Sequence, residues 1–560
     1  MAQTHHFRQG IKNLPEICIQ HGISKVVISP GSRNVPLVIA FTAHPQLECL
    51  SITDERSAAY FALGMAQQTG EAVALVCTSG TAVLNFAPAI AEAYYQNLPL
   101  VVFTADRPAE LIDQADGQTI RQTNIYQNYV KANFELPVET VHTADLAFSD
   151  RIISQAIDTA LTTPCGPVHI NVPMREPIYT ALPESHSNPR IIHTVKAEVL
   201  LTPDCLQQFQ TAWKSYNKKL ILIGIQSKNE ALNNLVNQFA NEPDTVVIAE
   251  NLSNISGERI ITTPEALFSF LNKNDKAEFT PDLLITIGHS VICKQLKIFL
   301  RTHKPAKHWQ LESSLPYVDT YQSLQSIISS SAVSFLGAMP LATSKGNFAE
   351  LYQNQKKESS KRHENFVKEL PFSDWLVVKK LLASLPKDAQ LQIANSTPIR
   401  ITQLFQSKEN ISYFCNRGTS GIDGSLSTAA GAAYASKKNT IFLTGDLSFI
   451  YDSNGLWNNY LPKNLKIIVL NNNGGNIFRL IGNSNLTTSC ENFFTTPHQV
   501  KIKALTEAFG VNYLTCEKEQ DLSSSLEKLY AADTCSVLEI KIDPEVNTEL
   551  YKSYFKQLAD

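Results

Sequence analysis

Short apolar runs alternate with segments of helical periodicity along the first hundred residues. The segments between the runs carry small and apolar residues at the spacing of a helix with a buried face. Such alternation predicts βαβ units around a parallel sheet with helices on both of its faces. The predicted strands lie at 25–30, 47–53, 71–79 and 98–106, and the predicted helices lie at 35–44, 55–70 and 81–97.

The same pattern recurs twice further along the chain. A proline-rich stretch at 164–189 predicts a linker after the first region, and a polar run at 344–365 predicts an exposed helical linker after the second. We therefore expect an α/β protein with three doubly wound parallel-sheet domains, at 1–185, 190–345 and 370–560. The further predicted strands lie at 218–226, 245–251, 281–291, 307–314, 389–396, 412–418, 439–446, 464–473 and 536–543.

The first and third regions also resemble each other. In each, a helix of small residues is followed by a strand that ends near a glycine: Gly64 precedes Gly80, and Gly431 precedes Gly445 at nearly the same interval. This is the pattern of a duplicated unit, although all parallel α/β folds share a strand–helix–strand rhythm. Two related domains that each hold part of a site would place the complete site between them.

The composition narrows the classes of function. The chain has 560 residues, of which 43% are hydrophobic and 18% are charged, with 48 Lys and Arg against 52 Asp and Glu for a net charge of −4. This balance excludes a disordered or strongly basic protein, and we expect neither a nucleic-acid partner nor a membrane span. The ten cysteines include no C-x-x-C pair, which favours reduced thiols and a cytoplasmic protein.

The strongest chemical signal is a pair of loops in the third region. Gly445 and Asp446 end one predicted strand, and Asn472 and Gly474 lie at the end of the next. Ligands bind beyond the carboxyl ends of strands in a doubly wound sheet, so the two loops should lie together. A carboxylate, an amide oxygen and a backbone carbonyl suit Mg²⁺, which also binds phosphate oxygens. The alternative is a helix cap at Asp446 and an ordinary turn at 471–475.

This pair of loops resembles the diphosphate and metal motif of thiamine diphosphate enzymes, which have a pyrimidine-binding, a middle and a diphosphate-binding domain. The resemblance implies thiamine diphosphate with Mg²⁺ or Mn²⁺, and metal ligands at Asp446, Asn472 and Gly474. It also implies an early glutamate that shares a proton with ring atom N1′ of the cofactor. The candidate is Glu55, at a strand-to-helix junction, where the helix dipole alone would also favour an acidic residue.

Four stretches make the resemblance more specific: 28–34, 104–108, 416–424 and 471–478. Together with Gln118, they resemble the 2-succinyl-5-enolpyruvyl-6-hydroxy-3-cyclohexene-1-carboxylate synthase family of menaquinone or phylloquinone biosynthesis. Members decarboxylate 2-oxoglutarate and add the resulting carbanion to isochorismate, so the resemblance implies a transferase that depends on thiamine diphosphate. The active sites of that family lie between subunits, which implies a homodimer or homotetramer.

The resemblance also assigns roles to residues. Both implied substrates are dicarboxylates, and the planar guanidinium group of Arg can bind a carboxylate through two hydrogen bonds. The implied substrate-binding residues are Ser32, Arg33, Arg107, Gln118, Lys294, Ser396, Arg400, Arg417 and Phe478. The implied cofactor-binding residues are Glu55, Ser420, Gly421, Ile422, Gly445, Asp446, Leu447, Asn472, Gly474 and Ile477, with Glu55 also catalytic.

Two alternatives stay open from the sequence. Another thiamine diphosphate-dependent 2-oxo acid decarboxylase or carboligase would share the metal motif and the glutamate, but not the loops at 28–34, 104–108 and 416–424 together. A non-catalytic protein could keep the fold and lose the reaction, although the presence of Glu55 and Asp446 argues against it. No G-x-x-x-x-G-K-[ST] loop occurs, which excludes a P-loop nucleotidase.

Overall fold

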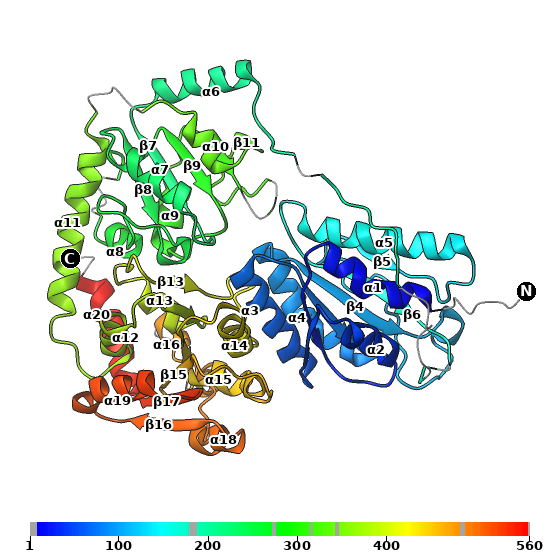
Figure 1. Ribbon diagram of the computed structural model, residues 1–560. Coiled ribbons are helices and arrows are strands. Elements are labelled where there is room, and N and C mark those ends of the chain that lie inside the picture. The colour runs from blue at the N-terminus through cyan, green and yellow to red at the C-terminus, as the bar shows by residue number, and fades with distance from the viewer. Residues whose placement is uncertain are drawn as a thin grey trace, which may run out of the picture.

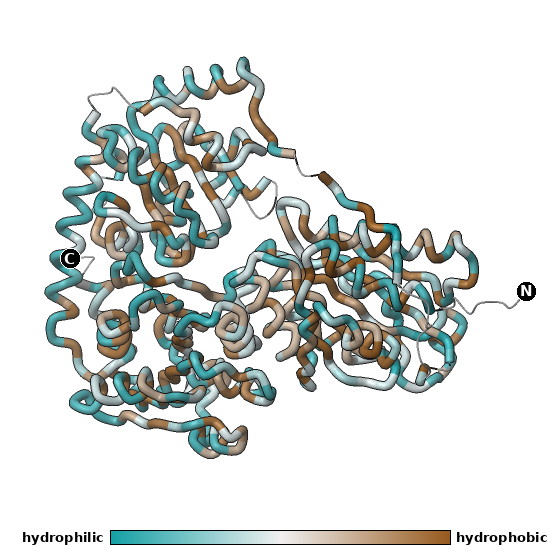
Figure 2. The backbone as a smooth tube through the Cα atoms, in the orientation of Figure 1, coloured by the Kyte–Doolittle hydropathy of each residue, from teal (hydrophilic) through white to brown (hydrophobic). Residues whose placement is uncertain are grey.

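Three parallel β-sheets follow one another along the chain in the computed structural model, and helices flank each of them (Figure 1). The structure describes residues 8–557 except for 177, 180–186, 196, 272–275, 313–314, 316, 342–345 and 482–487. The α/β class with three doubly wound parallel sheets is confirmed. The strands are the most hydrophobic parts of the trace in Figure 2, as expected for sheets that are covered on both faces.

The first sheet contains the apolar runs of the N-terminal region. Its elements are α1 (Gln9–Gln20), β1 (Lys25–Ile28), α2 (Val35–Ala43), β2 (Glu48–Ser51), α3 (Glu55–Thr69), β3 (Val73–Cys77), α4 (Thr81–Gln96), β4 (Leu100–Asp106), η1 (Ala109–Leu111), β5 (Asn133–Glu135), α5 (Thr143–Leu161) and β6 (Val168–Pro173). The strand order is β2-β1-β3-β4-β6-β5. Helices α1, α2 and α5 pack on one face of the sheet, and α3 and α4 pack on the other.

The interpretation of 164–189 as a linker is wrong for its first part. Val168–Pro173 forms β6, which pairs with both β4 and β5 and is buried along its whole length. The prolines misled the sequence analysis because they flank this strand instead of interrupting it. Pro173 is its last residue, where a missing backbone N–H costs least. Residues 177 and 180–186 of the predicted linker lie outside the described residues.

The second sheet has the strand order β11-β10-β9-β7-β8. Its elements are α6 (Pro203–Ser215), β7 (Lys219–Ile223), α7 (Glu230–Ala240), β8 (Thr245–Ala249), η2 (Asn251–Ser253), α8 (Pro264–Ser269), β9 (Leu283–Ile287), α9 (Lys294–Thr302), β10 (Lys307–Leu311), β11 (Ser326–Ile328) and α10 (Ala332–Gly337). The polar run then forms α11 (Phe348–Phe366), a largely hydrophilic helix along one edge of the molecule (Figures 1 and 2). Residues 344–345 of that predicted helix lie outside the described residues.

The third sheet repeats the topology of the first. Its strand order is β13-β12-β14-β15-β17-β16, which is the order of the first sheet when the strands of each are counted from their own start. Its elements are α12 (Asp374–Ser384), β12 (Gln390–Ile393), α13 (Thr397–Thr402), β13 (Ser412–Phe414), α14 (Ser425–Ser436), β14 (Thr440–Gly445), α15 (Asp446–Tyr451), η3 (Ser453–Leu456), β15 (Leu465–Asn471), α16 (Ile477–Ile481), α17 (Thr488–Thr495), α18 (Ile502–Ala508), β16 (Asn512–Cys516), α19 (Glu519–Ala531), β17 (Ser536–Lys541) and α20 (Pro544–Gln557). Among the described helices, none is both long and apolar enough to cross a lipid bilayer.

Helices α3 and α14 join the first and third sheets, and they lie side by side in Figure 1. Each contributes the glycine that marks the sequence repeat. A Cβ atom on Gly64 would lie 2.0 Å from the Thr428 carbonyl oxygen, and one on Gly431 would lie 1.9 Å from the Phe61 carbonyl oxygen. Side chains of both units form one continuous apolar core around this contact. The repeated glycines therefore allow the two backbones to approach closely.

We expect Gly431→Ala to lower the thermal midpoint of the protein. The added methyl group meets backbone that cannot rotate away, and such overpacking typically costs about 1–3 kcal/mol. Differential scanning calorimetry measures the change. Gly337→Ala is the matched control, because Gly337 also lies in a helix but a Cβ atom there would have no neighbour within 4 Å. Equal midpoints for the two variants would contradict the close-approach explanation.

Candidate active site

Asp446 lies at the carboxyl end of β14, where the chain turns into α15. Its side chain is 2% exposed. One carboxylate oxygen accepts from the Leu447 N–H at 2.7 Å, and the other accepts from the Gly474 N–H at 2.8 Å. The structure therefore brings together the two loops that the sequence predicted to meet, because β14 and β15 are neighbouring parallel strands whose carboxyl ends share one edge.

The second loop holds Asn472 and Gly474 in an irregular backbone. Gly474 has φ of +144°, and a Cβ atom there would lie 2.4 Å from the Thr495 carbonyl oxygen, so only glycine fits. Asn472 is 6% exposed, and its Oδ1 atom has no hydrogen-bond partner. A buried oxygen without a donor is costly unless a ligand completes it. This orphaned oxygen lies on the loop that contacts Asp446.

These atoms fit a divalent cation and a diphosphate. Asp446 supplies a carboxylate, Asn472 supplies the unpartnered oxygen, and the Gly474 carbonyl, which accepts from the Asn476 N–H at 3.0 Å, keeps a second lone pair. A Cβ atom on Gly445 would meet nothing within 4 Å, which leaves open space beside the carboxylate. Among the described residues no group of three His, Cys, Asp or Glu side chains could hold a metal, so mixed oxygen ligands are the fitting set.

His498 is a site neighbour that the sequence analysis missed. Its Nε2 atom lies 3.2 Å from the Asp446 carboxylate, and this hydrogen bond raises the pKa of His498 while partial burial opposes the shift. The segment before it packs on the metal loop, where the Thr495 carbonyl accepts from the Gly475 N–H at 2.6 Å. No motif surrounds His498 in the sequence, so only the fold could reveal this contact.

The loop at 416–424 approaches the same sheet edge from β13. Asn395 organises it from beneath, since its Nδ2 donates to the carbonyls of Asn416 and Gly421 at 2.6 and 2.7 Å. The Ile422 carbonyl accepts from the Ser448 hydroxyl at 3.1 Å, which ties the loop to α15. The predicted cofactor residues Ser420, Gly421, Ile422 and Leu447 therefore lie on adjoining loops with Asp446.

A buried glutamate of the first sheet anchors this loop. Glu92, on α4 and 1% exposed, accepts from the backbone N–H groups of Gly418 and Thr419 at 2.7 Å each and from the Thr419 hydroxyl at 2.5 Å. Hydrogen bonds to a carboxylate are about twice as strong as neutral ones. Glu92 was not predicted, although an acidic residue among the apolar positions of a helix was the available signal.

Glu55 is the first residue of α3, directly after the N-cap Asp54, whose side chain accepts from the Ser57 N–H at 3.2 Å. The Glu55 carboxylate is half-buried and accepts from Asn85 of α4 at 3.4 Å. Among the described residues, no hydrogen bond or ion pair joins it to the loops of Asp446 and Gly474. The structure thus places Glu55 at the strand-to-helix junction expected from the sequence, but away from the predicted metal ligands of its own chain.

Four predicted substrate residues gather around the end of β3. The Arg33 N–H donates to the Thr78 hydroxyl at 3.3 Å, and the Arg107 guanidinium donates to the Ser79 hydroxyl and to the Gln118 carbonyl at 2.8 Å each. Gln118 donates back to the Ser79 carbonyl at 3.1 Å. Both guanidinium groups already pair with acids, Arg33 with Glu176 and Arg107 with Asp116. The exposed Ser32 precedes Arg33.

A second basic group lies at the third sheet. The Arg400 guanidinium donates to the Ser396 carbonyl at 2.9 Å, and Arg417 donates to Asn395 at 3.0 Å. Burial and the nearby Arg417 lower the pKa of Arg400. Lys294 is exposed at the start of α9, whereas Lys297, one turn later, is half-buried, and its pKa is lowered by burial and affected by the charges of Glu250 and Arg417. Lys297, which was not predicted, is thus the α9 lysine that lies within electrostatic range of Arg417.

Strained backbone marks several of the predicted positions. Gln118, Ser396 and Ser420 have φ of +59°, +78° and +64°, although none is glycine. Each such residue costs about 1–3 kcal/mol, and such residues cluster at functional sites. Ile477 and Phe478 begin α16, where Ile477 is buried and Phe478 is exposed with its ring 5.4 Å from that of Phe494. Among the described residues, no hydrogen bond or ion pair joins the two basic groups to each other.

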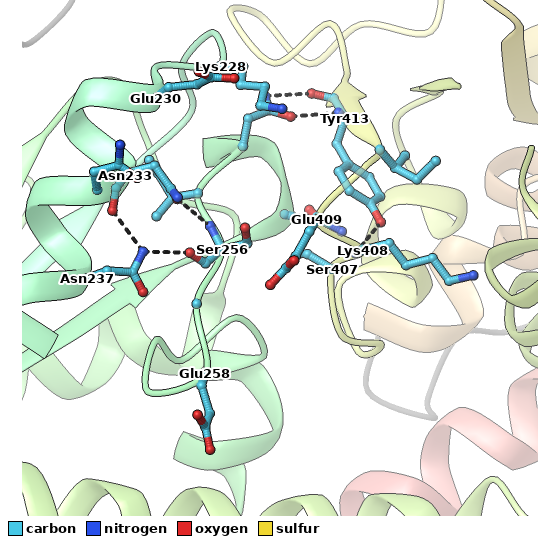
Figure 3. A pocket seen from close by; sticks show the side chains of 16 residues that line it. Lys228, Glu230, Asn233, Asn237, Ser256, Glu258, Ser407, Lys408, Glu409 and Tyr413 are labelled. Atoms are coloured by element: carbon cyan, nitrogen blue, oxygen red, sulfur yellow. Dashed lines mark hydrogen bonds between the residues drawn. The ribbon is translucent and has the colours of Figure 1, made fainter. Parts of the chain in front are cut away.

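A polar pocket of about 480 Å³ lies elsewhere, between the second and third sheets (Figure 3). Asn254 bridges its walls, since it accepts from the Tyr413 N–H at 2.7 Å and donates to the Tyr413 carbonyl at 3.1 Å. Asn233, Asn237 and Ser256 line the side of the second sheet in Figure 3. None of the predicted site residues is among those that line this pocket, so it is separate from the candidate active site.

Two parts of the chain match known families. Residues 9–128 match the family described as thiamine pyrophosphate enzyme, N-terminal TPP binding domain. Residues 396–540 match the family described as thiamine pyrophosphate enzyme, C-terminal TPP binding domain. The first match contains Glu55, and the second contains Asp446 and Asn472.

Similar proteins extend over nearly the whole chain. A 2-succinyl-5-enolpyruvyl-6-hydroxy-3-cyclohexene-1-carboxylate synthase of Flavobacterium psychrophilum is 42% identical over 98% of this chain and 98% of its own. A protein of the same name from Desulfotalea psychrophila is 39% identical over 96% of this chain and 99% of its own. The crystal structure of benzoylformate decarboxylase from Polynucleobacter necessarius, 18% identical, covers 95% of this chain and 98% of its own with a TM-score of 0.73, which shows a shared fold.

Proposed function

The chain belongs to the 2-succinyl-5-enolpyruvyl-6-hydroxy-3-cyclohexene-1-carboxylate synthase family of thiamine diphosphate enzymes, and we propose that it decarboxylates 2-oxoglutarate and adds the succinyl-semialdehyde unit to isochorismate. This is a transferase reaction of menaquinone biosynthesis. The resemblance stated from the sequence is thereby confirmed, and so is the enzyme class. The function is carried by identity of 39–42% over nearly the full length of relatives with this name.

The third sheet supplies the proposed metal and diphosphate site. Asp446, the Asn472 amide oxygen and the Gly474 carbonyl would hold Mg²⁺ or Mn²⁺, and the space beside Gly445 would take the diphosphate. The orphaned Asn472 oxygen and the contact between Asp446 and Gly474 support this assignment. Ser420, Gly421, Ile422, Leu447 and Ile477 would line the remainder of the cofactor cleft. When bound, thiamine diphosphate supplies the electron sink for the loss of CO₂.

The two basic groups would bind the substrates. Arg33 and Arg107 with Ser32 and Gln118, and Arg400 and Arg417 with Ser396, each present guanidinium groups on irregular loops, where they can bind carboxylates through two hydrogen bonds. Lys294 and Phe478 are the remaining proposed substrate residues. Glu176 and Asp116, which pair with two of these arginines, would give way to substrate carboxylates. Fixed cations of this kind suit two dicarboxylate substrates.

We place the complete site between two copies of the chain. Glu55 and the basic group of the first sheet form one half, and the metal loops and the basic group of the third sheet form the other. Among the described residues of one chain, no hydrogen bond or ion pair joins these halves. A homodimer or homotetramer in which Glu55 faces the metal loops of a partner subunit would complete the site, and the domain boundaries 1–185, 190–345 and 370–560 would separate the two halves.

The test is a two-substrate assay. The purified protein with Mg²⁺, thiamine diphosphate, 2-oxoglutarate and isochorismate should consume isochorismate and release an equal amount of CO₂. Isochorismate consumption is followed by absorbance, and CO₂ is followed by a coupled assay. Omission of either substrate should stop the formation of product. If pyruvate replaces 2-oxoglutarate without loss of rate, the proposed donor is wrong and a different carboligase activity is favoured.

A further inference from the structure

A fully buried carboxylate lies behind the proposed metal loop. Asp374, the first residue of α12, is 0% exposed, and neither of its carboxylate oxygens has a hydrogen-bond partner of good geometry. Among the described residues, no Lys, Arg or His forms an ion pair with it. A buried charge without a cation is costly and rare, so a specific use is expected where one persists.

Two amides and a second carboxylate surround Asp374. Asn547 of α20 accepts from the Asp374 N–H at 2.9 Å. Burial raises the pKa of Asp374 to about 7, the Asn547 amide lowers it, the Asp446 charge raises it, and the Asn472 amide lowers it. Asp374 therefore lies against the side chain of one proposed metal ligand and within electrostatic range of another. Asn547 and Asp374 come from elements that carry none of the predicted site residues.

The orientation of the Asn472 amide is the property that this arrangement controls. An amide has an NH₂ group, which donates, and an oxygen, which accepts or binds a cation. A carboxylate beside the NH₂ group holds the amide so that its oxygen points the other way. In this structure the Asn472 Oδ1 atom is buried and unpartnered, which is what that orientation requires.

We propose that Asp374 is a positioning residue that holds the Asn472 amide with Oδ1 directed at the divalent cation. The proposal rests on the metal site proposed above. Its carboxylate accepts from the Asn472 Nδ2 group, and its negative charge adds to the attraction of the loop for the cation. Groups that orient metal ligands in this way typically change metal affinity by about 10–100-fold when they are replaced. Asp374 itself touches neither substrate nor cation.

The test compares Mn²⁺ binding with the stability of the metal-free protein. In the presence of thiamine diphosphate, free Mn²⁺ is measured by electron paramagnetic resonance for the wild type, Asp374→Leu and Asp374→Asn. We expect Asp374→Leu to weaken Mn²⁺ binding by about 10–100-fold and Asp374→Asn, which keeps one acceptor oxygen, to weaken it less. In EDTA the melting temperature of Asp374→Leu should not fall, because the substitution removes a buried unpaired charge.

Ser373→Ala is the control for a purely structural role. Ser373 caps α12 by accepting from the Leu376 N–H, so its loss should lower the melting temperature in EDTA and leave Mn²⁺ affinity unchanged. If Asp374→Leu behaves like Ser373→Ala, or binds Mn²⁺ as tightly as the wild type, the proposal is overturned while the metal site stands. If the wild type binds no Mn²⁺ in the presence of thiamine diphosphate, the metal site and this proposal both fail. If Asp374→Leu does not fold, the affinity of Asp374→Asn decides.

Discussion

Asp446→Ala is expected to weaken the metal-dependent binding of thiamine diphosphate by more than about 100-fold, beyond the loss caused by residues that only orient metal ligands. The carboxylate is the one charged ligand of the proposed set, and it also accepts from the Gly474 N–H, so its removal disturbs both loops. Activity should fall below detection. Titration of the cofactor at fixed Mg²⁺, followed by calorimetry, measures the affinity.

Two further variants separate charge, geometry and substrate binding. Asp446→Asn keeps an oxygen that can accept from the Gly474 N–H, so the loop should persist while the charge is lost, and an intermediate affinity is expected. Arg107→Ala removes a guanidinium from the first sheet, far along the chain from the metal loops. It should raise the KM for substrate and leave the cofactor affinity nearly unchanged. Wild-type cofactor affinity in Asp446→Ala would refute the proposed metal site.

The central strands of each sheet could be predicted because they are buried on both faces. β3, β4, β14 and β15 are nearly continuous apolar runs, and such runs are readily distinguished from helices of small residues. The edge strands β5 and β16 were not predicted. Each pairs with only one neighbour and is mostly half-buried or exposed, so its sequence carries little hydrophobic pattern.

The metal loops could be predicted for a topological reason, since both follow neighbouring strands. The residues that support the site could not be found in this way. Glu92, Asn395 and Asp374 act through contacts between elements that lie far apart in the sequence, and no local spacing encodes such contacts. Lys297 was missed for Lys294 because the two lysines lie within one turn of α9, and only the packing of that helix shows which of them is half-buried near Arg417.

Glu55→Gln is expected to slow the exchange of the C2 proton of bound thiamine diphosphate, and with it turnover, by roughly 10²–10⁴-fold, the range of general acid–base catalysis. In the proposed site the Glu55 carboxyl holds a proton at ring atom N1′ of a cofactor whose diphosphate is bound by the partner subunit. A glutamine is nearly isosteric with glutamate but cannot share that proton. Deuterium exchange at C2, stopped with acid and read by NMR, measures the step without substrates.

Asp54→Asn is the matched control for this prediction. Asp54 lies beside Glu55 and caps the same helix, and Asn caps helices as well as Asp does, so the variant removes a neighbouring charge while α3 keeps its start. Its exchange rate should match that of the wild type. Exchange at the wild-type rate in Glu55→Gln would remove Glu55 from this role. Slow exchange in both variants would instead assign the effect to the negative charge at the start of α3, because Asp54 makes no contact with the cofactor in the proposed site.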